Sequence, residues 1–233
     1  ARDDPRISIM KTSLTVPIAI VVGGIIVAGA VYLSIQKVPT TDTGNDTPSL
    51  LRPVDATDHI LGNPAAKVLI VEYSDFDCDF CKTYHETLHQ IIAAAGANGQ
   101  VAWVLREFPL IEIHPNALPS ARAAECVAET AGNDAFWKFT DILFQNQPVD
   151  PIRFGEYAKA AGISGDAFAT CYANAATTVE AGILAGRQNA LAMGAEGTPY
   201  SIILTAGKAP VLLKGAYPYD AVKQLIDQAL TPQ

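Results

Sequence analysis

Two cysteines three positions apart are the residues of this chain best suited to chemistry. Cys78 and Cys81 directly follow an apolar run that predicts a strand, and they open a segment that predicts a helix. The N-terminus of a helix presents unpaired N–H groups and a partial positive charge, and both stabilise a thiolate. A thiolate attacks disulfides, and a second thiol one turn further along can close a disulfide with it. The motif therefore predicts thiol-disulfide exchange, with Cys78 as the exposed nucleophile and Cys81 as the more buried resolving thiol.

Two alternatives explain the same cysteines. His85 and His89 follow Cys81 at successive helical turns, so one helix face offers a sulfur and two imidazoles to a zinc ion. Structural zinc usually takes its ligands from two separated segments, which favours ordinary helix-face histidines. The other alternative is a pair of cysteines that only fills the core, and the strand-turn-helix context argues against it.

The segments around the motif predict an α/β domain. KVLIVEY at 67–73 and VAWVLREF at 101–108 are short apolar runs typical of buried strands, and a helix is predicted between them at 78–95. A strand, a helix and a strand in this order imply a parallel pair with a right-handed crossover. The other expected elements are helices at 120–131, 134–145, 151–161, 166–193 and 219–230, and strands at 201–205 and 211–214.

The N-terminal part predicts a membrane tether. Residues 14–36 carry no charge and are long enough to cross a bilayer as one helix. Basic residues are concentrated before this stretch, which predicts a cytoplasmic segment at 1–13 and a body outside the cell membrane. An A-x-A site at 28–30 leaves a cleaved signal peptide as the alternative, and both interpretations export the body. Residues 37–57 are rich in Thr, Asp and Pro and are expected to link the tether to a domain at 58–233.

The charge balance limits the partners of this chain. It has 16 Lys and Arg against 24 Asp and Glu, a formal net charge of −8. An acidic chain argues against binding the phosphate backbone of nucleic acids, which needs clustered basic residues. No nucleotide, flavin or metal motif is visible in the sequence, so we expect the cysteines themselves to act as the redox cofactor.

The stretch VEYSDFDCDFC at 71–81 resembles the active-site segment of the DsbA family of thioredoxin-fold oxidoreductases. The resemblance continues in order over about 58–230. It implies a thioredoxin-like fold with a helical insertion at about 115–195. The other matching stretches are DHILGNP at 58–64, REFPL at 106–110, HPNA at 114–117, AAEC at 123–126, FW at 136–137, GTP at 197–199 and KGA at 214–216.

The resemblance assigns roles to three more residues near the cysteines. Pro199 would be a cis-proline beside them, and the backbone of Thr198 would pair with a substrate peptide. A proline that merely starts a strand is the alternative. Glu72 would move a proton to and from Cys81, because a buried carboxylate is costly without such a role. An exposed position on the strand is the alternative for Glu72.

The remaining two cysteines, Cys126 and Cys171, fall within the expected helical insertion. Some members of the DsbA family carry a structural disulfide there, and an oxidising compartment favours one. The resemblance therefore implies a bond between Cys126 and Cys171. Two buried free thiols are the alternative.

One position departs from the family pattern. Relatives commonly have proline after the first cysteine, whereas this chain has Asp79 there and Asp77 on the other side. Carboxylates near Cys78 oppose ionisation of its thiol. We therefore expect a higher pKa for Cys78 and a less oxidising couple than in the strong oxidants of the family.

The resemblance implies an oxidase that donates its disulfide to reduced exported proteins. A membrane protein of the DsbB or VKOR kind would reoxidise it. An isomerase or reductase on the same scaffold is one alternative, and Asp79 favours it. A tethered peptide-binding or zinc-stabilised module without redox turnover is another, against which the paired cysteines and Pro199 both argue.

Overall fold

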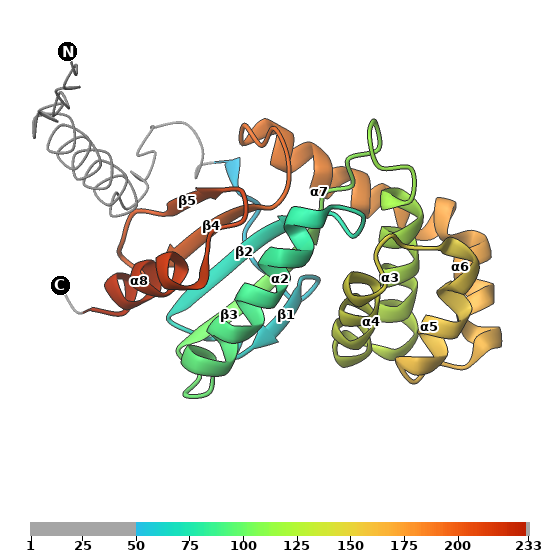
Figure 1. The fold of residues 1–233 in the computed structure, drawn as a ribbon, viewed down its shortest axis with the longest axis horizontal. Coiled ribbons are helices and arrows are strands. Elements are labelled where there is room, and N and C mark those ends of the chain that lie inside the picture. The colour runs from blue at the N-terminus through green and yellow to red at the C-terminus, as the bar shows by residue number, and fades with distance from the viewer. Residues whose placement is uncertain (1–49, 232–233) are drawn as a thin grey trace, which may run out of the picture. The chain divides into compact units, whose positions relative to one another are not determined.

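A five-stranded sheet in the order β1-β3-β2-β4-β5 forms the centre of the domain in the computed structural model, which describes residues 50–231 (Figure 1). The predicted parallel pair is confirmed as β2 and β3, and the other neighbouring strands are antiparallel. The strands are β1 (His59–Gly62), β2 (Val68–Ser74), β3 (Val101–Glu107), β4 (Tyr200–Thr205) and β5 (Val211–Lys214).

Helices cover both faces of the sheet, which explains why its central strands are largely apolar on both sides. Helix α2 (Asp79–Ile91) continues into a π-turn at Ile92–Gly96 and lies with α8 (Tyr219–Leu230) on one face. Helix α7 (Glu180–Ala192) lies on the other face (Figure 1). Side chains of β2 alternate accordingly: Val68 and Ile70 pack in the cluster that includes α2 and α8, while Val71 packs in the cluster that includes Ala190 of α7.

The predicted helical insertion is confirmed as a block of helices beside the sheet (Figure 1). Gly132 forms the tight turn between the first two helices of this block, Ala117–Ala131 and Asn133–Gln145. Its φ of 79° favours glycine. The block consists of α3 (Ala117–Ala131), α4 (Asn133–Gln145), a 3₁₀ turn at Pro151–Arg153, α5 (Phe154–Ala160) and α6 (Gly165–Thr178).

The single helix predicted at 166–193 is wrong, because the chain breaks there into α6 and α7 at Val179. Three β-branched residues in succession, 177–179, lose side-chain freedom in a helix. The hydroxyls of Thr177 and Thr178 also bond to the backbone carbonyl of Asn174, at 2.8 and 3.2 Å. Such local bonds compete with the helical ladder and favour a break at this point.

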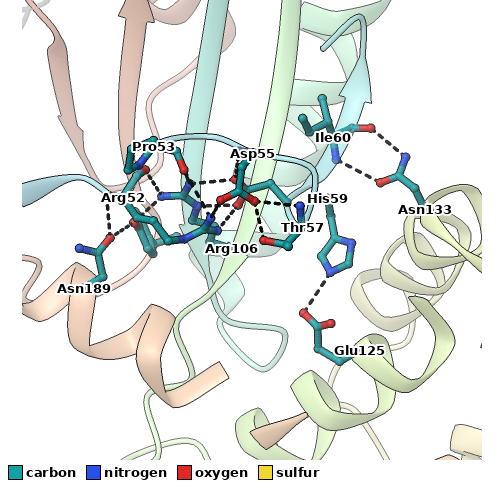
Figure 2. A network of polar contacts seen from close by, with 12 residues as sticks. Arg52, Pro53, Asp55, Thr57, His59, Ile60, Arg106, Glu125, Asn133 and Asn189 are labelled. Carbon is teal, nitrogen blue, oxygen red and sulfur yellow. Dashed lines mark hydrogen bonds and ion pairs between the residues drawn. The ribbon is translucent and has the colours of Figure 1, made fainter. Parts of the chain in front are cut away.

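Residues 50–58, which precede β1, pack against the domain, which the sequence did not predict. Figure 2 shows Arg106 of β3 at the centre of a polar network that holds this segment. Its guanidinium donates to both carboxylate oxygens of Asp58, at 2.8 and 3.0 Å, and to the carbonyls of Arg52 and Pro53. The part of the predicted linker at 50–57 is therefore packed against the domain, and the part at 37–49 lies outside the described residues.

The strand β1 was also absent from the predicted elements. It has four residues at the edge of the sheet, too short for an alternating pattern to be recognised. Its pairing with β3 and the hydrogen bonds of Asn133 to both backbone groups of Ile60 hold it in place (Figure 2).

The predicted membrane tether at 14–36 and the cytoplasmic segment at 1–13 lie outside the described residues. The alternative cleavage site at 28–30 lies outside them as well. Among residues 50–231, no helix combines the length and apolar character needed to span a membrane.

A disulfide between Cys126 and Cys171 joins α3 to α6 within the helical block. We expect the Cys126→Ser/Cys171→Ser variant to lose roughly 2–4 kcal/mol of unfolding free energy, because a cross-link between distant residues restricts the unfolded chain. Denaturant unfolding of the variant and the wild type measures this loss. A difference below about 0.5 kcal/mol would mean that the bond contributes no stability.

Candidate active site

The Cys-x-x-Cys motif lies where the central strand β2 passes into α2, as predicted. Cys78 is the N-cap residue of α2 in an extended conformation, and Cys81 lies in the first helical turn. The prediction that Cys78 is exposed is wrong, because only 5% of its surface is accessible to solvent, against 0% for Cys81. Gln147, from the loop after α4, covers this turn and donates to the carbonyls of Phe76 and Cys78, at 2.7 and 3.3 Å.

The environment separates the pKa values of the two thiols. A hydrogen bond from the Cys81 thiol is the largest cause that lowers the pKa of Cys78, to about 6. Burial opposes this effect, while Thr198 and the backbone N–H groups of Cys81 and Phe80 add to it. Burial and the charge of Cys78 raise the pKa of Cys81 well above its usual range. At neutral pH the reduced pair therefore holds one thiolate, on Cys78, and one thiol, on Cys81.

The expectation drawn from Asp79, a higher Cys78 pKa than in the strong oxidants of the family, stays a prediction. A value of about 6 is higher than the roughly 3.5 of DsbA itself. The main causes acting on the Cys78 thiol are its hydrogen bonds and its burial, and neither Asp77 nor Asp79 is among them.

Thr198 and Pro199 lie beside the nucleophile. The peptide bond between them is cis, and the Cys78 sulfur lies 3.7 Å from the carbonyl oxygen of Thr198, to which the protonated thiol donates. A pocket of about 200 Å³ opens next to this bond and is lined by Gly197, Thr198, Pro199, Lys214 and Gly215 among others. The fold thus brings together two segments that are 120 residues apart in sequence.

Glu72 is fully buried on the central strand, so the exposed alternative is wrong. The indole N–H of Trp103 donates to its Oε2 atom at 2.9 Å. Burial raises the pKa of Glu72 to about 8, against the opposing effects of Ser74 and Trp103. The charge of Glu72 also raises the pKa of Cys81. Glu72 is therefore protonated near neutral pH and electrostatically coupled to the resolving thiol.

Asp75 and His114 belong to the same site, although the sequence did not single them out. The buried Asp75 carboxylate accepts the N–H groups of Asp77 and Leu110, both at 2.8 Å, and lies 2.9 Å from Nδ1 of His114. Its own backbone N–H points at the Cys81 sulfur, 3.4 Å away. Although burial alone would lower it, the pKa of His114 is raised by this carboxylate and by Cys78. The sequence feature that could have identified Asp75 is its position, as an acidic residue directly after a buried strand. No such feature in the sequence identifies Gln147.

The zinc alternative built on Cys81 is not supported among the described residues. The ligand atoms of His85 and His89 gather around Asp141 instead, while the Cys81 sulfur accepts the backbone N–H of Asp75. The dithiol motif and the two histidines are therefore separate features of α2.

Comparisons with known proteins agree with this geometry. Residues 55–228 match the family model described as Thioredoxin. The structure of alpha-DsbA1 from Wolbachia pipientis superposes with a TM-score of 0.66 at 21% identity, covering 78% of this chain and 94% of that one. The oxidised BdbD structure from Bacillus subtilis gives 0.61 at 25% identity, covering 74% and 92%.

Several curated relatives are named as Na(+)/H(+) antiporters. NhaA 1 of Mycolicibacterium gilvum is 37% identical over 123 residues, which make up 51% of this chain and 19% of the antiporter. NhaA 3 of Salinispora tropica is 36% identical over 112 residues, which make up 46% of this chain and 16% of that antiporter. The chain thus spans less than a fifth of the length of these curated relatives.

Proposed function

This chain belongs to the thioredoxin family and has the DsbA-like form of its fold, and on this premise we propose that it oxidises dithiols in exported proteins. The observation that carries the proposal is the geometry of the pair: Cys78 is the N-cap of α2 beside the cis Thr198–Pro199 bond, while Cys81 is fully buried in the first turn. This arrangement favours a thiolate on Cys78 and a thiol on Cys81. A good leaving group at the outer sulfur makes the disulfide of this pair easy to transfer to another protein.

The reaction starts from the Cys78–Cys81 disulfide. A substrate thiolate attacks the Cys78 sulfur, the bond to Cys81 breaks, and Cys81 leaves with the electron pair. Glu72 supplies the proton that Cys81 takes up, because its pKa of about 8 keeps it protonated until then. A second substrate thiolate then attacks the substrate sulfur of the mixed disulfide and releases Cys78 as a thiolate. Two electrons have moved from the substrate to the pair, and the substrate holds a new disulfide.

The substrate peptide binds beside Thr198 and Pro199 in this proposal. The Thr198 carbonyl lies against the Cys78 sulfur, and the adjoining pocket leaves room for a peptide side chain. An extended peptide that pairs with the Thr198 backbone would bring its cysteine to the nucleophile. Main-chain hydrogen bonds of this kind bind peptides of different sequences, as an oxidase of many substrates requires.

Regeneration of the disulfide requires an electron acceptor. We assign this role to a membrane protein of the DsbB or VKOR kind. The apolar stretch at 14–36 supports this assignment, because a single-pass anchor with its N-terminus in the cytoplasm would hold the domain outside the membrane, beside such a partner.

We expect a reduction potential of roughly −190 mV for the Cys78/Cys81 couple. At pH 7 a pKa near 6 stabilises the reduced form by about 3 kcal/mol less than a pKa near 3.5, which lowers the potential by roughly 65 mV from the −120 mV of DsbA. Equilibration of the full chain in glutathione buffers measures the value, with Cys81→Ser as the control without a couple.

The measured potential also decides among the alternatives. A value near −270 mV, as in thioredoxin, would contradict the oxidase and favour a reductase. A value near −120 mV would contradict a pKa of about 6 for Cys78. The absence of any reversible couple would favour a peptide-binding or zinc-stabilised module.

A further inference from the structure

Three side chains of metal-ligating types converge where α2 meets α4, beginning one helical turn after Cys81. His85 and His89 lie on successive turns of α2, and Asp141 lies on α4, which packs against α2. Each histidine Nε2 atom is 2.8 Å from the same oxygen, Oδ1 of Asp141. The two Nε2 atoms are 3.1 Å from each other. Three potential ligand atoms thus form a small triangle.

The dimensions of this triangle fit one metal ion. Zinc binds imidazole nitrogen and carboxylate oxygen at about 2.0–2.2 Å, so two ligand atoms of one tetrahedral ion lie roughly 3.4 Å apart. The three atoms need to separate by only a few tenths of an ångström to reach this spacing. We propose that His85, His89 and Asp141 bind a divalent transition-metal ion of the zinc type.

The alternative is a cluster of hydrogen bonds without a metal. Both imidazoles would then direct an N–H group at the same carboxylate oxygen, with the two donor nitrogens side by side. A cation at this point would instead satisfy both nitrogen lone pairs and the carboxylate charge together. Two neutral imidazoles and one carboxylate are a ligand set used by zinc and neighbouring transition metals, whereas calcium and magnesium prefer sites made of oxygen atoms.

The surroundings hold the two imidazoles in place. Trp103 packs against both rings, with centroids 5.0 Å from that of His85 and 5.4 Å from that of His89. Phe144 packs against His85 at 4.4 Å. An apolar shell of this kind limits the access of water to a metal site.

The opposite side of the cluster is open. The side chains of His89 and Asp141 are 38% and 35% exposed, and a cavity of about 380 Å³ adjoins the cluster, lined also by Lys82, Glu86 and Gln145. An ion held by three protein ligands would keep a free position on this side for water or another small ligand. The site is therefore accessible to an ion from solution, and no cysteine takes part in it.

Zinc binding to the full chain tests the proposal directly. The 233-residue chain is purified in detergent with Cys78 and Cys81 oxidised, so that no thiolate competes, and is titrated with ZnCl₂ by calorimetry. We expect one ion per chain. We expect His89→Gln and Asp141→Asn each to weaken binding by about 10–100-fold or more, because loss of even an outer-shell partner costs this much.

A matched control comes from the other group of ligand-type side chains, His59, Glu107 and Glu125. His59→Gln removes a histidine from that group and is expected to leave the zinc affinity unchanged. Cobalt bound to the wild type is expected to show ligand-field absorption without a thiolate charge-transfer band. The proposal is overturned if the oxidised wild type shows no saturable binding, if both variants bind like the wild type, or if only His59→Gln loses the ion.

Discussion

Replacing Cys78 with serine is expected to lower disulfide transfer by several orders of magnitude, to the uncatalysed background. Serine keeps the shape of the side chain but has no sulfur to form the mixed disulfide. Replacing Cys81 with serine is expected to have a different effect. The Cys78 thiolate still attacks a substrate disulfide, but no second thiol resolves the product, so covalent complexes accumulate. Oxidation of a reduced peptide, together with non-reducing gels, measures both effects.

The pair Cys81→Ser and Cys81→Ala provides a sharper control. The Cys81 thiol is the hydrogen-bond donor that lowers the pKa of Cys78 most. A serine hydroxyl can also donate, whereas alanine cannot. Titration of the thiolate absorbance is therefore expected to give a higher Cys78 pKa in Cys81→Ala than in Cys81→Ser. Equal values in the two variants would contradict the role assigned to this hydrogen bond.

Replacing Glu72 with glutamine is expected to remove a large pH dependence of stability. In the folded protein its pKa is raised from 4.5 to about 8 by burial. Between these values the folded state holds a proton that the unfolded chain has released, so stability falls as pH rises. The slope is about 1.4 kcal/mol per pH unit, and the total loss is roughly 4–5 kcal/mol by pH 8. Glutamine does not titrate, so the Glu72→Gln variant lacks this slope.

Denaturant unfolding of the reduced chain between pH 5 and pH 9 measures the difference. Other groups titrate in both proteins, so the difference in slope isolates Glu72. Glutamine still accepts the hydrogen bond from Trp103, and any cost of its buried amide is independent of pH. Parallel slopes in the two proteins would show that Glu72 is ionised in the folded state.

The same variant tests the proton transfer. General acid catalysis typically contributes roughly 10²-fold or more to a rate. We expect Glu72→Gln to slow the step in which Cys81 leaves, while the pKa of Cys78 stays close to that of the wild type. An unchanged rate would remove Glu72 from the mechanism even if its effect on stability were found.

Much of the fold follows from patterns within single segments. The helix at 219–230 and the strand at 211–214 were predicted with their observed bounds, and the dithiol motif was placed correctly at a helix start. Hydrophobic periodicity and helix-start geometry are short-range properties, so the sequence contains them directly. The prediction failed where a signal was weak or contradictory, as in the four residues of β1 and at the break at Val179.

The sequence by itself thus determined the chemistry of this protein, two cysteines at the right spacing after a strand. Only the tertiary structure decided how that chemistry is tuned. Gln147 reaches the cysteine turn from 71 residues beyond Phe76, and Asp141 meets His85 across 56 residues. A pKa depends on the burial and charges around a group, and these come from other elements. Periodicity shows which face of an element is apolar, but not which element that face meets.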